Sequence, residues 1–241
     1  GSIDGHKNAA GGIIPFLKVT NDIAVAVDQL GTRKGAIAVY IEPWHMDVSD
    51  FLDLRKNSGE ERRRAHELFP ALWINDLFMQ RVEKNERWTL FDPADTPDLC
   101  DLYGDEFNKK YIEYENHPDI AKSVVQAKEL WKKILTSYFE SGMPFLCFKD
   151  SANRANPNSH KGIIRSSNLC TEIFQNTEPN YYQTKVIYTD GSYDLFDENS
   201  DITVDGGYTK KAKKITALDR LNNKDIFIVE KYGFGLYLLS A

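Results

Sequence analysis

The spacing of apolar residues near the start of the chain predicts a helix followed by a buried strand. Phe16, Val19, Ile23 and Val27 recur every three or four positions, which is typical of one face of an α-helix. The run over residues 35–41 reads Gly-Ala-Ile-Ala-Val-Tyr-Ile and contains no charged side chain. A run of this kind predicts a strand that is covered on both faces, as in a parallel sheet.

The alternation of helix and strand patterns continues to about residue 150. Short apolar runs predict further strands at 71–74, 88–91 and 145–148. Helices are predicted at 50–55, 60–68, 76–84, 97–114 and 120–141, and Gly142 ends the last of them. Strands that alternate with helices indicate an α/β fold with a parallel sheet, either layered or closed into a barrel.

The last quarter of the chain has a different pattern, with short strands and tight turns. Residues 185–189 and 192–196 flank Asp190-Gly191, a pair that fits a two-residue type I′ hairpin turn. Gly206-Gly207 predicts another turn. We therefore predict two domains, an α/β domain over residues 1–176 and a hairpin-rich extension over residues 177–241.

Charge and cysteine content narrow the possible functions. The chain has 30 basic and 36 acidic residues and a net charge of −6, which argues against sequence-independent binding of nucleic acid but permits binding of single nucleotides. No apolar run approaches the ~18 residues that a membrane span requires, and residues 1–6 lack the pattern of a signal peptide. Cys100, Cys147 and Cys170 form no disulfide framework, so we expect a cytoplasmic protein in which the first two serve core packing.

The stretch with the most chemical potential is residues 163–173. If it is extended, Asn168, Cys170 and Glu172 lie on one face of the chain. A thiol between an amide and a carboxylate suits acid–base or radical chemistry, because the amide orients a hydroxyl and the carboxylate takes its proton. On the residues alone, an amphipathic strand with one buried cysteine remains the alternative.

Residues 167–173 read Ser-Asn-Leu-Cys-Thr-Glu-Ile, and this sequence resembles the finger-loop motif of the class I ribonucleotide reductase large subunit, closest to its eukaryote-like branch. Four more segments resemble this family in the same order: residues 35–45, 51–57, 71–79 and 141–150. The resemblance therefore covers about residues 11–176, which is most of the first predicted domain.

The resemblance implies a fold and a set of catalytic roles. The family fold is a ten-stranded α/β barrel of the ribonucleotide reductase and glycyl radical type, and this chain is expected to supply the first half-barrel with the finger loop. Cys170 is expected to form the thiyl radical that takes the 3′ hydrogen of a ribonucleotide. Glu172 is expected to act as base on the 3′ hydroxyl, Asn168 to hydrogen-bond the substrate hydroxyls, and Leu169 to contact the substrate.

The resemblance also implies ligands and partners. The substrate is expected to be a ribonucleoside diphosphate, and nucleoside triphosphates (ATP or dNTPs) are expected to act as effectors. Residues 29–34 resemble the second specificity loop, which points to Gln29 and Arg33, and Asp4 and Gly5 resemble part of the first. The radical is expected from the dinuclear metal centre of a separate small subunit, so we expect no metal or other cofactor on this chain, and α subunits are expected to form a homodimer.

Other readings and several departures from the family pattern bear on activity. Residues 42–47 contain possible metal ligands, but a turn that packs Trp44 is the stronger interpretation. The two cysteines with which the family reduces its substrate have no match here, and residues 232–241 do not align. We therefore expect a fragment of the catalytic subunit that is inactive alone. The alternatives are a nucleotide-binding or assembly module without chemistry, and a cysteine hydrolase that pairs Cys170 with His160, for which no motif is present.

Overall fold

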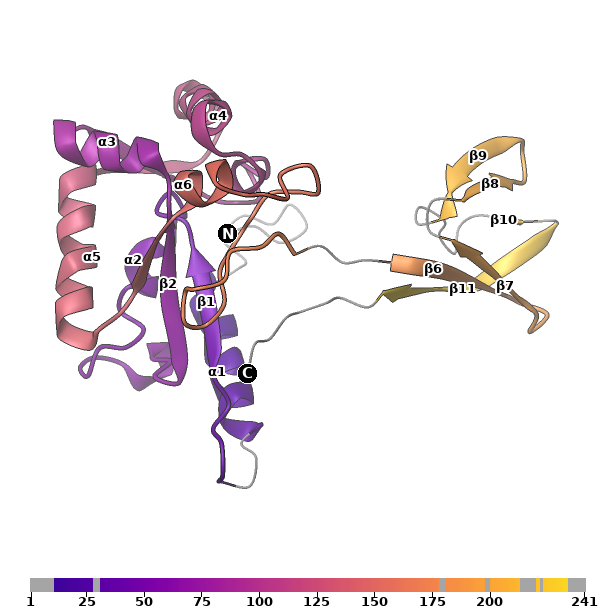
Figure 1. Ribbon diagram of the computed structural model, residues 1–241, viewed down its shortest axis with the longest axis horizontal. Helices are drawn as coiled ribbons and strands as arrows, with labels where there is room; N and C mark the ends of the chain where they lie inside the picture. The colour runs from indigo at the N-terminus through magenta and orange to yellow at the C-terminus, as the bar shows by residue number, and fades with distance from the viewer. Residues whose placement is uncertain are drawn as a thin grey trace. The chain divides into compact units, whose positions relative to one another are not determined.

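A computed structural model describes residues 11–27, 31–177, 181–197, 200–212, 220–221 and 223–233 (Figure 1). The chain divides into two compact units, residues 1–176 and residues 177–241. The described elements of the first unit are, in chain order, α1 (Ile14–Ala26), β1 (Ile37–Ile41), α2 (Val48–Phe51), a 3-10 helix (Glu61–Arg63), β2 (Leu68–Ile74), α3 (Asp76–Lys84), β3 (Arg87–Phe91), a 3-10 helix (Leu99–Asp101), α4 (Gly104–Asn116), β4 (Lys122–Gln126), α5 (Ala127–Ser141), β5 (Phe145–Phe148) and α6 (Lys149–Arg154).

A parallel sheet of order β1-β2-β5 forms the framework of the first unit. Because Tyr40 pairs with Ala71 and Trp73 pairs with Cys147, the side chains of Tyr40, Trp73 and Cys147 lie on the same face, which we call the inner face. Ile41 and Leu72 lie on the opposite, outer face. The prediction of an α/β fold with a parallel sheet is confirmed.

The outer face of the sheet packs against the helices. Figure 1 shows α3 and α5 together on one side of β2. Ile41, Leu72 and Ile74 of the strands join one apolar core with Phe78 of α3 and Ile134 of α5, and all five side chains are buried. Apolar residues are thus present on both faces of β2, which explains its nearly unbroken apolar sequence.

Several predicted helices differ from the structure. Residues 120–141 were expected to form one helix, but 122–126 form β4, which pairs antiparallel with β3, and α5 begins only at Ala127. The β-branched pair Val124-Val125 favours a strand, and Val124 points to solvent with 51% exposure, so its helical spacing was coincidental.

The other boundaries shift for local reasons. The helix expected at 60–68 is a 3-10 turn at Glu61–Arg63, because Leu68 already belongs to the central strand. The helix expected at 50–55 is the short α2, and the helices expected around 97–114 are a 3-10 turn and α4. Helices α1 and α3, the four predicted strands (β1, β2, β3 and β5) and the end of α5 at Gly142 (φ 73°) are confirmed.

The described part of the second unit consists mainly of β-strands. Its described strands are β6 (Tyr181–Tyr188), β7 (Tyr193–Asp197), β8 (Asp201–Val204), β9 (Tyr208–Lys211), β10 (Arg220–Leu221) and β11 (Lys224–Gly233). They form an antiparallel sheet of order β10-β11-β6-β7 and a separate β8–β9 hairpin that turns at the predicted Gly206-Gly207 pair.

The hairpin at Asp190-Gly191 is present, but its turn is not of type I′. Tyr188 N–H donates to the Ser192 carbonyl and Gly191 N–H donates to the Tyr188 carbonyl, which leaves a three-residue loop. Gly191 has a positive φ of 83°, and Asp190 is not among the residues with positive φ. This pattern is that of a type I turn followed by a left-handed residue.

Candidate functional site

Residues 163–173, which contain the predicted finger-loop motif at 167–173 and are called the finger loop below, do not form an extended strand. The chain reverses over residues 168–171, where the Asn168 carbonyl accepts a hydrogen bond of 3.3 Å from Thr171 N–H, and Thr171 has a φ of 63°. We call these four residues the cysteine turn. The extended conformation that would place Asn168, Cys170 and Glu172 on one face of a strand is therefore not present.

The side chain of Asn168 accounts for the reversal. Its Oδ1 accepts hydrogen bonds of 3.1 Å from the backbone N–H groups of both Glu172 and Ile173. Asparagine often competes with regular backbone structure in this way. Ser167 closes the same loop, because its hydroxyl donates to the Ile173 carbonyl at 2.6 Å.

The turn separates the predicted site residues by exposure. Cys170 and Glu172 are exposed, whereas Asn168 and Leu169 are partly buried next to them. The structure thus places a thiol and a carboxylate two residues apart on one short loop, where both can reach a ligand. The amide oxygen of Asn168 is used within the loop.

The finger loop rests on the inner face of the sheet. Tyr40 of β1 donates from its hydroxyl to the Asn168 carbonyl at 2.9 Å. Trp73 of β2 stacks on Phe174 with ring centres 5.9 Å apart and planes at 20°. Before the turn, Ile164 packs against Trp73 and Cys147. In Figure 1 the segment that follows α6 runs on the side of the sheet away from α5.

Asn153 of α6 fixes the entry to the finger loop. Its side chain accepts from Ile164 N–H at 2.8 Å and donates to the Ile164 carbonyl at 3.0 Å. Sequence analysis identified neither Asn153 nor Tyr40 and Trp73 as part of this site. The only available signal was the alternation of side chains along the predicted strands, which places Tyr40 and Trp73 on one face.

The groups beneath the turn remain in their neutral forms. Burial raises the pKa of Tyr40, and the nearby Cys147 thiol adds to this rise while a hydrogen bond with Ser167 opposes it, so the Tyr40 hydroxyl stays protonated and can donate. Burial also raises the pKa of the Cys147 thiol, which makes it a poor nucleophile. Cys147 packs in the interior as expected, but Cys100 is exposed, so core packing does not explain it.

Charged and polar residues occupy the carboxyl ends of all three parallel strands. Glu42, Asn75 and Lys149 follow β1, β2 and β5, and Lys149 Nζ lies 2.8 Å from Glu42 Oε1. Glu42 Oε2 also accepts from Trp44 Nε1 at 2.7 Å and from Asn75 Nδ2 at 3.1 Å. Burial raises the pKa of Glu42, and Lys149 opposes this effect. Residues 42–47 thus form the expected turn around a buried Trp44.

Two further findings hold for the residues that the structure describes. Among them, no group of three or more His, Cys, Asp or Glu side chains is placed to hold a metal ion. No helix in this part of the chain has both the length and the apolar character that crossing a membrane requires.

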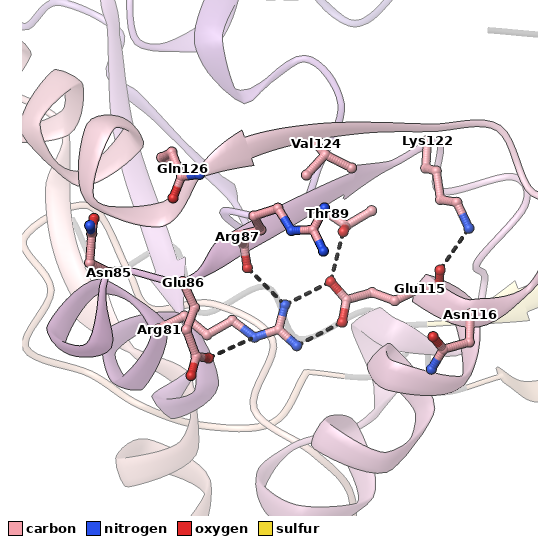
Figure 2. Close-up of a pocket in the computed structure, with 10 residues that line it drawn as sticks. All are labelled: Arg81, Asn85, Glu86, Arg87, Thr89, Glu115, Asn116, Lys122, Val124 and Gln126. Atoms are coloured by element: carbon pink, nitrogen blue, oxygen red, sulfur yellow. Dashed lines mark hydrogen bonds and ion pairs between the residues drawn. The ribbon is translucent and has the colours of Figure 1, made fainter.

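A polar hollow of about 660 Å³ lies beside the antiparallel pair β3–β4 (Figure 2). At its centre Arg81 and Glu115 form two hydrogen bonds of 2.7 Å, and Thr89 donates to the same carboxylate. Burial alone would lower the pKa of Arg81, but Glu115 outweighs it and raises that pKa. The central charges neutralise each other, and none of the predicted site residues lines this hollow.

The residues predicted to bind effectors are only partly described. Arg33 is exposed in the loop between α1 and β1. The loop returns close to the end of α1, since a Cβ added at Gly35 would collide with the carbonyl oxygen of Ala24. Gln29, Asp4 and Gly5 lie outside the described residues.

Comparison with known proteins identifies the family. The sequence-family model of the ribonucleotide reductase barrel domain matches residues 1–202, which is most of the chain. The chain belongs to this family. The parallel sheet and the finger loop are therefore parts of a ribonucleotide reductase barrel domain, as the resemblance implied.

Comparison with individual proteins leads to the same family. The chain is 63% identical over 229 residues to the ribonucleoside-diphosphate reductase subunit alpha of Helicobacter pylori strain J99, a match that covers 95% of this chain and 29% of the relative. It is 52% identical over 178 residues to the subunit alpha of Chlamydia trachomatis serovar D (72% of this chain, 17% of the relative). The large subunit of Arabidopsis thaliana is 53% identical over 178 residues (73% and 22%). The chain thus spans less than a third of the length of these relatives.

The Helicobacter match also concerns the second unit. A match over 229 of 241 residues leaves only 12 outside it, so it contains residues 13–229 wherever it begins. Most of the β-strand unit is therefore shared with that subunit.

Proposed function

We propose that this chain is part of the catalytic α subunit of a ribonucleoside-diphosphate reductase, which reduces ribonucleotides to deoxyribonucleotides for DNA synthesis, and that Cys170 carries the radical. The observation that supports this most directly is the cysteine turn, which presents Cys170 next to Glu172 in a chain 63% identical to such a subunit. The fold would be completed by the remaining strands of a ten-stranded barrel, with residues 177–241 as an extension.

In this proposal each group of the turn has one task. The Cys170 thiyl radical takes the 3′ hydrogen atom of the ribonucleotide and becomes a thiol, which leaves a carbon radical at C3′. Glu172 takes the proton of the 3′ hydroxyl, and this eases departure of the 2′ hydroxyl as water. A dithiol supplies two electrons and two protons and becomes a disulfide; one proton leaves with the 2′ hydroxyl as water and the other is added at C2′. The hydrogen atom held by Cys170 then returns to C3′, which regenerates the thiyl radical. Holding the sugar next to the sulfur contributes much of the rate, because the reacting atoms need a fixed geometry.

Asn168 and Leu169 would position the substrate. Because Asn168 Oδ1 accepts two backbone N–H groups of the loop, the carboxamide nitrogen is the atom that would donate to a substrate hydroxyl. Leu169 lies next to Cys170 and would contact the sugar. The main contribution of Asn168 would be to hold Glu172 at a fixed distance from the thiol.

The remaining partners follow from the family. We propose a ribonucleoside diphosphate as substrate, nucleoside triphosphates as effectors near Asp4, Gly5, Gln29 and Arg33, and a homodimer of α subunits. A separate small subunit with a dinuclear metal centre would supply the radical. The cysteines of the chain, Cys100, Cys147 and Cys170, are all unbridged, which fits a reducing cytoplasm.

The test replaces Cys170 by Ser in the full-length subunit and measures reduction of labelled cytidine diphosphate with the small subunit, an effector and a reductant. We expect product to fall to background while nucleotide binding is retained, and Glu172→Gln to cripple turnover as well. Cys100→Ser, which alters an exposed cysteine outside the loop, serves as the matched control and should remain active. The 241-residue chain alone should give no multiple turnover.

Two outcomes would contradict the proposal. Turnover above background in Cys170→Ser would show that another group starts the reaction. Nucleotide binding without reduction in the unmodified full-length protein would support the alternative, a binding or assembly module without chemistry.

A further inference from the structure

Tyr40 occupies a position between the sheet and the cysteine turn. It lies on the inner face of β1, and its ring meets Trp73 edge to face with centres 6.0 Å apart and planes at 86°. The ring therefore has little freedom, and its hydroxyl is directed at the Asn168 carbonyl, 2.9 Å away. The two residues are 128 positions apart in the sequence, so this bond joins the turn to a distant part of the fold.

The Asn168 carbonyl is also the closing point of the turn. The same oxygen accepts the N–H of Thr171, and the side chain of Asn168 accepts the N–H groups of Glu172 and Ile173. Hydrogen bonds to the backbone and side chain of Asn168 thus hold the turn together, and Tyr40 joins Asn168 to the sheet. A shift of Asn168 would move Cys170 and Glu172 together.

We infer that Tyr40 is a positioning residue for Cys170, acting through its hydrogen bond to the backbone of Asn168. The expected effect on turnover rests on the proposed function. The hydrogen bond between Tyr40 and Asn168 does not depend on that function. The Tyr40 hydroxyl contacts the Asn168 backbone and not the Cys170 thiol. It sets where the cysteine turn lies relative to the inner face, and small displacements of a reacting group cost large factors in rate.

Backbone hydrogen exchange in the 241-residue chain tests whether the hydrogen bond from Tyr40 to Asn168 stabilises the cysteine turn. Tyr40→Phe removes the hydroxyl and keeps the ring, so the contact with Trp73 remains. We expect the amides of Thr171, Glu172 and Ile173 to exchange about two- to tenfold faster, the effect of one net hydrogen bond on a local opening equilibrium. Amides of the central strand, residues 68–74, should keep their rates.

Tyr114→Phe is the matched control. Tyr114 of α4 also donates a single hydrogen bond of 2.9 Å, to Asp98, and should leave the three loop amides unchanged. Unchanged loop amides in Tyr40→Phe would overturn the inference. Equal acceleration in residues 68–74 would overturn it too, because the hydroxyl would then only support overall stability.

Turnover in the full-length subunit separates positioning from substrate binding. With cytidine diphosphate as substrate, Tyr40→Phe should lower kcat about two- to tenfold and leave KM unchanged, the same factor as for the hydrogen bond. A raised KM with unchanged kcat would overturn the positioning role and leave the role of Cys170 intact. Activity of Cys170→Ser would instead defeat the proposed function, whatever Tyr40→Phe shows about the loop amides.

Discussion

Replacing Lys149 by Met tests whether the buried ion pair at the strand ends supports the first unit. The Lys149 side chain is fully buried, and its Nζ donates to Glu42 Oε1 at 2.8 Å and to the carbonyls of Leu99 and Cys100 at 3.0 and 3.2 Å. All three ammonium hydrogens are therefore used. Methionine keeps most of the length and the apolar stem but removes the charge and the donors.

The expected loss in the free energy of unfolding follows from the Glu42 carboxylate, which stays buried when Lys149 is replaced. Removing one partner of a buried ion pair costs about 3–5 kcal/mol, because the other charge stays buried without compensation. Glu42 keeps its hydrogen bonds from Trp44 and Asn75, so we place the loss near the lower end, at about 3 kcal/mol. Glu42→Gln in addition removes the uncompensated charge, and the double variant should recover at least about 1 kcal/mol.

The loss should also depend on pH. Burial raises the pKa of Glu42 above its ordinary value of 4.5, and losing Lys149 removes an influence that lowers it. A carboxyl group whose pKa is higher in the folded state favours folding most below its unfolded pKa, and this contribution disappears as the pH rises through the folded pKa. The deficit of Lys149→Met against the unmodified chain should therefore be smaller at about pH 5 than at about pH 8.

Urea unfolding followed by tryptophan fluorescence measures the effect. All four tryptophans, Trp44, Trp73, Trp88 and Trp131, belong to the first unit, so the signal reports on that unit alone. Lys128→Met, at an exposed position of α5, is the control and should change the free energy of unfolding by less than about 0.5 kcal/mol. A loss below about 1 kcal/mol, or no recovery in the double variant, would refute the reasoning.

Two further substitutions test the loop between α1 and β1. Gly35→Ala should lower the free energy of unfolding by about 1–3 kcal/mol, because the new Cβ would meet the Ala24 carbonyl oxygen. Gly11→Ala is the control and should leave the free energy of unfolding unchanged, because its new Cβ would meet only the Pro15 side chain at 3.7 Å. Equal thermal midpoints for the two variants would contradict the clash at Gly35. In the full-length subunit, Arg33→Ala should change the ratio of reduced bases several-fold for a given effector, in line with a coupling of ~1–3 kcal/mol. Product ratios that stay the same under every effector would show that Arg33 does not couple the effector to the choice of substrate base.

Local pattern sufficed for the parts of the fold that neighbouring residues determine. The spacing of Phe16, Val19 and Ile23 predicted α1, although these side chains are exposed and Ile14, Leu17 and Ala24 form its buried face. The apolar runs predicted the three parallel strands. Val124 shows the limit of this reasoning, because a strand that pairs with β3 can carry apolar residues at helical intervals by coincidence. Pairing with another strand is a tertiary property that periodicity does not contain.

The sequence motif proposes a chemistry for the candidate site, which stays a prediction, but it does not contain the geometry of the loop. The motif identified Cys170 and Glu172, but it could not show that the Asn168 side chain folds back onto the loop amides. The supporting contacts join distant residues: Tyr40 and Asn168 are 128 positions apart, and Glu42 and Lys149 are 107 apart. Such contacts form only when the parallel sheet brings β1 and β5 together with the segments that follow them, so sequence spacing does not predict them.

The backbone of Thr171 has a consequence for how this loop can evolve. A β-branched residue with a φ of 63° is held in a region that its side chain disfavours, at a cost of about 1–3 kcal/mol. Selection for thermal stability alone would therefore favour glycine or asparagine at this position. The same replacement would let the backbone beside Cys170 relax, so a more durable protein would be obtained at the expense of a defined position for its thiol.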